Sequence, residues 1–384
     1  MTSRIQGLDA ARGTMMLLGV FVHAAIVIPA FMPVSSLDGV VFDVFYAFVH
    51  LFRMPVFFLI SGIFAARLLR TEGVRAFLIS RFKRIVSVFL TAAAIVAIFL
   101  WNTGCTWCAP TDSRDYINTG LIYLWFLYYL ALISHLALML WLVVRWFKTR
   151  MRASSSMSAS ARAGSTRSGL RLRPLEAGVI AVLLALIPGL TDSTGQVRVE
   201  MGWIPNLSLL LFFGAFFAIG WFIDSDRETT LGDIKSGALW NSALAGGFSA
   251  GSWLLMAETA HPWQPALQIF AVTFAAFAVT GLFLRYLHAE SDLVRYLADS
   301  SYWVYLFHAP VMYGAVFALS KTGLEPLLVA AISIATALAA TLVSYHYLVR
   351  STIIGRYLSG RRRPRRIRGF VESGHQTHAS SGGN

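Results

Sequence analysis

The feature that most constrains this chain is the recurrence of long apolar runs. Ten of them can be counted against the roughly 30 Å of hydrocarbon that a membrane helix must cross, near residues 13–32, 40–66, 85–101, 120–147, 175–190, 205–223, 236–257, 265–287, 301–320 and 325–348. Hydrophobic residues make up 57% of the sequence and charged residues only 13%, which excludes an ordinary soluble protein. The predicted fold is all-α, a polytopic membrane protein with about ten transmembrane helices.

The distribution of lysine and arginine predicts the orientation. These residues gather in two predicted loops, 67–84 and 145–173, and in the tail at 356–368, all of which fall on one side of a ten-helix chain. Positive charge marks the cytoplasmic side, so both termini are predicted to be cytoplasmic. The acidic loop 224–235 is also predicted to lie inside, and acidic residues contribute little to this rule. Basic cytoplasmic segments next to anionic lipids account for the net charge of +13. A nucleic-acid partner is therefore not expected.

The predicted organisation is a transmembrane domain over 1–350, with a basic cytoplasmic linker at 148–174 inside it and a basic, disordered cytoplasmic tail over 351–384. The first apolar run lacks a small-residue cleavage pattern, so we expect it to remain as a helix. Cys105 and Cys108 lie in a predicted outer loop, where an oxidising periplasm permits a disulfide. A metal site would need two further ligands nearby, and none is adjacent, so no metal is expected.

Two ionisable residues stand at the start and the middle of the first run, Arg12 and His23. Charge inside a bilayer costs about 2.5–3.5 kcal/mol per arginine on insertion scales, so such residues indicate a functional site. Eleven positions turn a helix by roughly 1100° and raise it by roughly 16 Å, so the two side chains share one face. Asp9, three residues before Arg12, lies on the same face and can neutralise the guanidinium.

The second run carries His50 and Arg53, three residues apart and therefore on a similar side of a helix. Pro55 frees a backbone carbonyl within the membrane, a break tolerated only where protein or water satisfies it. Arg53 is predicted to face the interior of the bundle. Its role is either contact with the substrate or a structural bond to carbonyls of a neighbouring helix.

Polar residues recur at helical spacing in the ninth run, at Ser301, Tyr302, Tyr305 and His308. Tyr302 lies near a predicted membrane boundary, where tyrosine often serves only as an anchor. His308 lies deeper, and the alternative to a catalytic role is a histidine satisfied between helices.

Two further patterns are weak when taken alone. Arg81 and Arg84 are one turn apart on the predicted cytoplasmic side, and guanidinium pairs grip phosphates, although positive-inside charge produces such pairs freely. Trp125 belongs to an aromatic cluster, 124–129, at the predicted outer interface. That cluster is typical of membrane anchoring or of sugar stacking.

Taken together, these segments resemble the acyltransferase-3 family of bacterial membrane acyltransferases. The resemblance covers nearly the whole chain and rests on four motifs, Leu8-Asp9-Ala-Ala-Arg12-Gly13 with His23, Phe52-Arg53-Met-Pro55 followed by Ser61-Gly62, Arg81-x-x-Arg84, and Ser301-Tyr302-x-x-Tyr305-Leu-x-His308. Within the family, segments 50–64, 124–127 and 345–356 are similar to the glucan biosynthesis protein C branch, the succinyltransferases of osmoregulated periplasmic glucans.

The resemblance implies an enzyme of the bacterial inner membrane. It would take an acyl group from cytoplasmic acyl-CoA, as succinyl-CoA or acetyl-CoA, and deliver it to a hydroxyl of a periplasmic glucan or another glycan. Membrane lipids and glucan-synthesis membrane proteins are the further partners it implies. No permanently bound cofactor is expected.

The residues found above fit this chemistry. His23 is the candidate base or nucleophile, because histidine has an ordinary pKa near 6.5. Arg53 or Tyr305 would stabilise the oxyanion, or Arg53 would pair with a succinyl carboxylate, which is costly to bury alone. The remaining candidates fall into three groups: His308 in catalysis; Arg12, Arg81 and Arg84 for the coenzyme A phosphates; and Asp9, His50, Ser61, Ser301, Tyr302 and Trp125 for substrate contact.

Two other functions stay open. A family relative could O-acetylate another surface polysaccharide, a lipid-linked sugar or an antibiotic. A protein of a different class, a transporter, could use Arg12, His23 and Arg53 as an ion or proton path.

Overall fold

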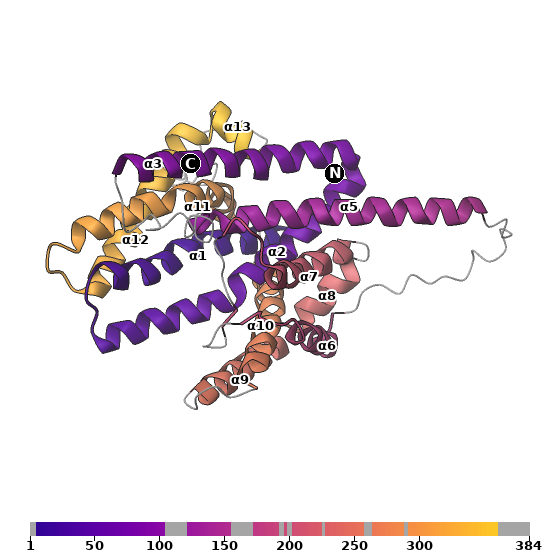
Figure 1. Cartoon of the computed structure of the whole chain (residues 1–384), viewed down its shortest axis with the longest axis horizontal. Coiled ribbons are helices and arrows are strands. Elements are labelled where there is room, and N and C mark those ends of the chain that lie inside the picture. Colours follow the sequence, from indigo (N-terminus) through magenta and orange to yellow (C-terminus); the bar gives the residue numbers. More distant parts are fainter. Residues whose placement is uncertain are drawn as a thin grey trace, which may run out of the picture. The chain divides into compact units, whose positions relative to one another are not determined.

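The computed structural model describes residues 5–103, 121–154, 172–191, 196–197, 202–224, 227–256, 263–287 and 291–359, and Figure 1 shows them as helices and connecting turns. Among these residues, β-type pairing is limited to an isolated bridge between Thr191 and Val197. The predicted all-α class is therefore confirmed. Cys105, Cys108, residues 155–171 of the predicted linker and residues 360–384 of the predicted tail lie outside the described residues.

The chain divides into two compact units. Unit 1 comprises residues up to Val49 and from Tyr286 onward; it contains α1 (Gln6–Phe31), the first part of α2 (Ser36–Arg81), α11 (Asp292–Leu319), α12 (Pro326–Ser344), η5 (Tyr345–Val349) and α13 (Ile353–Ser359). Unit 2, His50–Arg285, contains the rest of α2, η1 (Phe82–Val86), α3 (Ser87–Thr103), η2 (Ile122–Leu124), α5 (Trp125–Ser154), α6 (Pro174–Ala185), α7 (Leu207–Ile223), α8 (Arg227–Ser236), α9 (Ala238–Met256) and α10 (Gln264–Tyr286).

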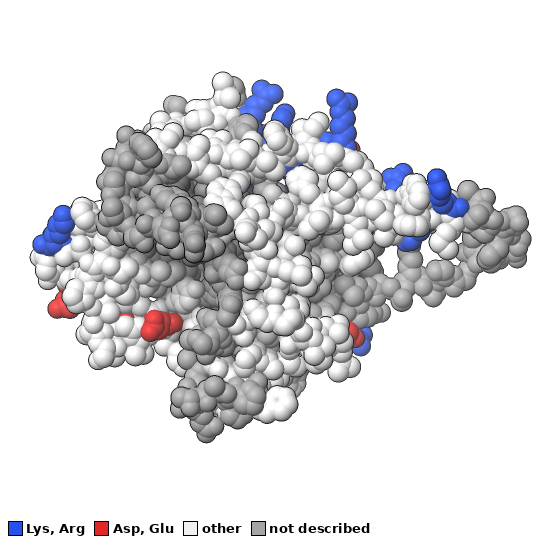
Figure 2. Space-filling model, viewed as in Figure 1, with Lys and Arg blue, Asp and Glu red and all other residues white. Residues whose placement is uncertain are grey.

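A helix is present at each of the ten predicted apolar runs. Within the described residues, six helical segments are long and apolar enough to cross a membrane, Gln6–Phe31, Ser36–Ala94, Trp125–Met151, Gln264–Tyr286, Asp292–Leu319 and Pro326–Val349. Figure 2 shows that few side chains on the described surface in view are charged, and large apolar side chains such as Met139 and Leu140 are exposed. Such a surface suits lipid, so the chain is a multi-pass membrane protein. The number of ten spans and the cytoplasmic termini stay predictions.

The basic segment 67–84, expected to be a loop, is instead helical. Helix α2 continues through Pro55, and its non-helical residue is Gly73, whose φ of 82° is a conformation that favours glycine. A π-helical turn, η1, then follows Arg81 directly. The helix thus continues past Arg53 and Pro55, and its kink lies at Gly73, about five turns beyond Pro55.

Helices α1, α11 and α12 pack together in unit 1. Their buried apolar side chains form one cluster, with Val20 and Ile28 from α1, Val304 and Met312 from α11, and Val329 from α12. The backbones of α1 and α11 approach closely, because a Cβ placed on Gly13 would lie 2.8 Å from the Ala298 Cα. Small residues permit this approach in membranes, and it brings the polar residues of the two helices together.

In unit 2, α2 and α7 cross at two glycines. A Cβ on Gly62 would overlap the carbonyl oxygen of Phe217, and a Cβ on Gly220 would overlap that of Leu59. Each glycine thus faces the backbone of the opposite helix. Aromatic packing continues beside the crossing, where the rings of Phe58 and Phe213 stack with centroids 4.7 Å apart.

The start of α7 is fixed by Asn206, whose Oδ1 accepts a hydrogen bond from the Leu209 amide at 3.2 Å. The Asn206 amide in turn donates to the Tyr129 hydroxyl at 2.8 Å, which joins α7 to α5. Asn206→Ala removes the side-chain cap and is expected to lower the free energy of unfolding by about 1 kcal/mol. Asn206→Asp keeps a capping oxygen and should melt like the parent protein. Equal melting temperatures for all three proteins in detergent would contradict the capping role.

Candidate active site

Two histidines meet in the interior of unit 1. The ring centroids of His23 on α1 and His308 on α11 are 5.0 Å apart. His308 is 0% exposed, and His23 is half-buried. The surrounding residues are apolar, among them Val20, Ala24 and Val304. Two titratable side chains therefore pack against each other, one of them fully buried, which makes the pair a candidate for acid–base chemistry.

The protonation pattern of neutral His308 follows from its hydrogen bonds. Its Nδ1 lies 3.0 Å from the carbonyl oxygen of Val304 and 2.8 Å from that of Tyr305. A carbonyl oxygen only accepts, so Nδ1 carries the proton and donates. In the neutral imidazole the lone pair then lies on Nε2. In this tautomer the nitrogen of His308 that could accept a proton is Nε2.

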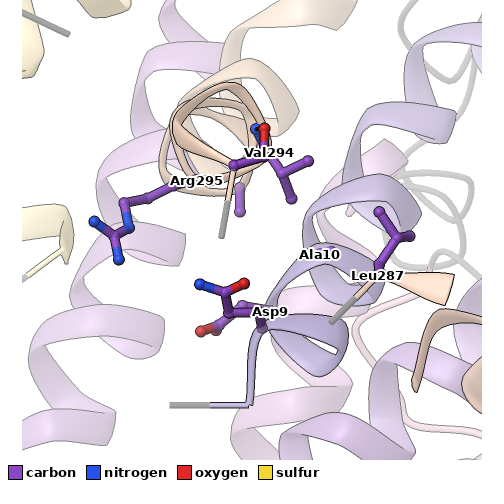
Figure 3. Close-up of a pocket in the computed structure, with 8 residues that line it drawn as sticks. Asp9, Ala10, Leu287, Val294 and Arg295 are labelled. Atoms are coloured by element: carbon purple, nitrogen blue, oxygen red, sulfur yellow. Dashed lines mark hydrogen bonds between the residues drawn. The ribbon is translucent and has the colours of Figure 1, made fainter. Parts of the chain in front are cut away.

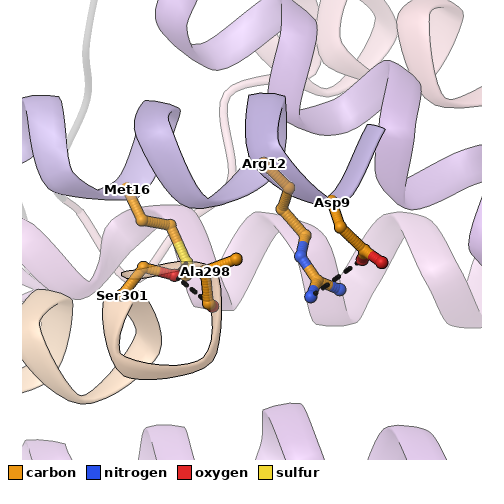
Figure 4. A network of polar contacts seen from close by, with 5 residues as sticks. All are labelled: Asp9, Arg12, Met16, Ala298 and Ser301. Carbon is orange, nitrogen blue, oxygen red and sulfur yellow. Dashed lines mark hydrogen bonds and ion pairs between the residues drawn. The ribbon is translucent and has the colours of Figure 1, made fainter. Parts of the chain in front are cut away.

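A polar line runs along α1 and α11 on one side of this pair. The expected ion pair is present, with Arg12 Nη2 3.5 Å from Asp9 Oδ1, and Asp9 is buried. Closer to the histidines, the Ser301 hydroxyl donates to the Ala298 carbonyl at 2.9 Å and lies 3.7 Å from Met16 Sδ. Figure 4 shows both groups along the same stretch of α1.

The aromatic residues of α11 take different places. Tyr305 is buried, with its ring centroid 6.1 Å from that of His308. Tyr302 is half-buried. Its neighbour Trp303 donates through Nε1 to the Ser344 hydroxyl of α12 at 3.0 Å. The ring of Tyr305 is therefore a buried neighbour of His308 on α11.

Unit 2 holds the other predicted residues. Arg53 is only 7% exposed, and Ser61, two turns further along α2, is also buried. His50 is half-buried. Trp125 is buried and packs against Phe213, with ring centroids 5.8 Å apart. A buried position for Arg53 agrees with the prediction that it faces the interior. Trp125 packs inside the unit, and its predicted sugar contact stays a prediction.

Arg81 and Arg84 stand at the π-helical turn η1. The Arg81 guanidinium lies over the Phe77 ring at 5.1 Å, whereas the side chain of Arg84 is exposed. A π-turn re-aims the side chains around it and is frequent at functional sites. The two guanidinium groups therefore occupy different surroundings despite their one-turn spacing.

A second π-helical turn, η5, precedes an arginine that the sequence reasoning did not select. Arg350 is buried, and its guanidinium lies 4.9 Å from the ring centroid of Tyr296 on α11. The segment containing Arg350 contributed only to the family resemblance. No spacing within 345–350 indicated that its arginine packs on α11. Among the described residues, no cluster of three or more candidate metal ligands occurs.

Comparison with known proteins adds a family assignment. Residues 5–346 match a family model described as an acyltransferase domain. Two similar relatives are proteins named glucans biosynthesis protein C. The one from Salmonella schwarzengrund (strain CVM19633) is 22% identical over 328 residues, and the one from Salmonella paratyphi B (strain ATCC BAA-1250 / SPB7) is 23% identical over 340 residues. Both alignments cover 79% of this chain and 81% of the relative. No solved structure matches.

Proposed function

Because the chain belongs to the acyltransferase-3 family, whose domain spans residues 5–346, we propose that it transfers a succinyl group from cytoplasmic succinyl-CoA to hydroxyls of a periplasmic glucan. The family makes it a membrane acyltransferase. The observation that carries the proposed chemistry is the His23–His308 pair in the apolar interior of unit 1. The name of the relatives, glucans biosynthesis protein C, supports the glucan acceptor.

The proposed reaction uses the Nε2 lone pair of His308. Nε2 takes the proton of the acceptor hydroxyl while the hydroxyl oxygen attacks the thioester carbonyl. The carbon–sulfur bond then breaks, and the imidazolium returns its proton to the departing thiolate. The Nδ1 hydrogen bonds at 3.0 and 2.8 Å hold the ring in the tautomer that this step needs. We therefore favour His308 over His23 as the base, with His23 beside it to stabilise or relay the proton.

Negative charge develops on the carbonyl oxygen during the attack. The Tyr305 hydroxyl belongs to the same face of α11 as His308 and is the proposed oxyanion donor in unit 1. A hydroxyl donor of this kind is effective because the surroundings are apolar.

Three arginines of unit 2 retain their proposed roles in anion binding. A succinyl group brings a free carboxylate, and burial of Arg53 supplies a guanidinium that is already desolvated. Arg81 and Arg84 are proposed to bind phosphate groups of the donor, and the exposure of Arg84 suits contact with a ligand from the aqueous side.

The test uses purified full-length protein in nanodiscs, incubated with periplasmic glucan and either succinyl-CoA or acetyl-CoA. Release of coenzyme A is measured alongside mass spectrometry of the glucan. We expect succinyl-CoA to give glucan of increased mass, and acetyl-CoA to react at least tenfold more slowly. Efficient acetylation would instead support an O-acetyltransferase. Absence of coenzyme A release with every acceptor would refute acyl transfer and favour a transporter.

A further inference from the structure

A pocket opens in unit 1 between the first turns of α1 and α11. The pocket is small and partly open to the surface, so a ligand would place only one small polar group in it. Figure 3 shows Arg295 and Val294 extending from α11, with Asp9 and Ala10 on α1. The other lining residues are Gln6, Leu287, Ser291 and Ala298. Of all these residues, only Asp9 was selected from the sequence.

The polar groups of this pocket are suited to a ligand. The Gln6 Oε1 is buried and has no hydrogen-bond partner among the described residues. A buried amide atom in this state is unfavourable unless a ligand or water satisfies it. The oxygen and nitrogen of the amide exchange places by a 180° rotation, so Gln6 can also present its NH₂ group as a donor. The Ser291 hydroxyl caps α11, accepting from the Val294 amide, and therefore serves the fold.

The charge around the pocket favours an anion. The Asp9 carboxylate is paired with Arg12 at 3.5 Å, which offsets its negative charge. Arg295 adds a guanidinium to the lining. Helix α1 begins here, and its Ile5 N-cap position provides no side-chain hydrogen bond. The positive end of this helix dipole adds to the field of Arg295.

We propose that this pocket binds a phosphate group at the nucleotide end of the acyl donor, with Arg295 and the Gln6 amide as its hydrogen-bond donors. The inference rests on the proposed function, which makes a coenzyme A thioester the donor. Arg295 and His308 are thirteen residues apart on α11, an axial distance of about 20 Å. Coenzyme A carries its sulfur on a long flexible arm, so its phosphates and thioester can occupy distant parts of one site.

The position of the pocket supports this assignment. Ala298 lines the pocket, and its carbonyl accepts the hydrogen bond of Ser301. The pocket thus lies at the end of the polar line that leads along α11 to His308. Leu287, Val294 and Ala10 supply the apolar part of the pocket wall.

The test measures binding of coenzyme A, the free thiol, to full-length protein in phosphatidylcholine nanodiscs by calorimetry. Pantetheine, which lacks the phosphates and the nucleotide, is the second ligand. Arg295→Gln is expected to raise the Kd for coenzyme A about tenfold or more, as loss of a charge-assisted hydrogen bond does. Gln6→Glu should raise it further by adding negative charge. The Kd for pantetheine should stay unchanged in both variants.

Lys321→Gln is the matched control. It also removes one positive charge from unit 1, but at the other end of α11, where Lys321 Nζ lies 3.9 Å from the Phe317 ring. Coenzyme A binding should be unchanged in this variant. The proposal is overturned if both pocket variants bind coenzyme A like the parent, or if they lose pantetheine equally. If Arg295→Gln fails to fold, Gln6→Glu decides alone.

A lipid phosphate is the other source of the same chemistry, and nanodiscs containing phosphatidylglycerol separate the two. If Arg295→Gln leaves coenzyme A binding unchanged but removes stabilisation by phosphatidylglycerol, the pocket belongs to lipid and the proposal fails. Coenzyme A binding is measured without catalytic turnover, so the pocket can be tested independently of the proposed glucan acylation. A parent protein that binds coenzyme A through Arg295 yet modifies no glucan refutes only the proposed acceptor. A parent protein that transfers acyl groups while both pocket variants bind normally refutes only the pocket.

Discussion

Replacing His308 with alanine is expected to reduce the rate of acyl transfer by about 10²–10⁴-fold, the usual contribution of a general base. The physical reason is the Nε2 lone pair, which the Nδ1 hydrogen bonds to Val304 and Tyr305 fix in place. The measurement is coenzyme A release with saturating glucan, normalised to folded protein. A rate within threefold of the parent would remove His308 from the chemistry.

His135→Ala is the control for this substitution. His135 makes the same kind of bond within its own helix, from Nδ1 to the Ala131 carbonyl at 2.7 Å, but it lies on α5 in unit 2. Its loss should therefore leave the rate unchanged. His308→Gln keeps a polar side chain of similar size without a basic nitrogen, so it should be as inactive as His308→Ala while folding normally.

The pairing of the two imidazoles adds a second expectation. If His23 and His308 act as one unit, the double alanine variant should be no slower than the slower single variant, because effects of coupled catalytic groups do not add. The 5.0 Å between their ring centroids is the basis of this expectation. Rate losses that multiply in the double variant would show that the two histidines act independently.

The helices could be predicted because hydrocarbon imposes its own pattern on a sequence. Every long apolar run became a helix, since an unsatisfied backbone is prohibitive in lipid. The segment 67–84 differs from the prediction. Its positive charge indicated a cytoplasmic loop, whereas its remaining residues have good helix propensity. No sequence pattern predicted the π-helical turns η1 and η5, because the extra residue in such a turn depends on packing against other helices.

The site was predictable only within single helices. Spacing placed Arg12 with Asp9 and Tyr305 near His308, and both relations are present. Spacing cannot show that His23 packs against His308, because that contact joins opposite ends of the chain through the close approach at Gly13. The contact of Arg350 with Tyr296 was hidden because it joins two separate helical segments, and spacing relates residues only within one helix. The pocket residue Gln6 lies before the first apolar run and carries no charge, so no sequence pattern indicated a functional role for it.

The second large effect concerns stability. Gly62→Ala is expected to lower the free energy of unfolding by about 3 kcal/mol, the upper part of the usual range for overpacking. The added Cβ would overlap the Phe217 carbonyl oxygen. This oxygen belongs to the main chain of α7, so it cannot move aside as a flexible side chain would. Gly220→Ala should do the same against Leu59, on the other side of the crossing. The measurement is thermal denaturation in detergent, with an expected fall of about 4 °C for a chain of this length.

Gly214→Ala is the matched control, because it lies on the same helix α7 and a Cβ there would have no atom within 4 Å. Alanine is a better helix former than glycine, so this variant should melt at or slightly above the parent temperature. If Gly62→Ala also melted like the parent, α2 and α7 would not be in backbone contact. Because Arg53 and Ser61 lie on the same helix as Gly62, separation of the crossing should also lower acyl transfer, and activity should fall together with melting temperature in both destabilised variants.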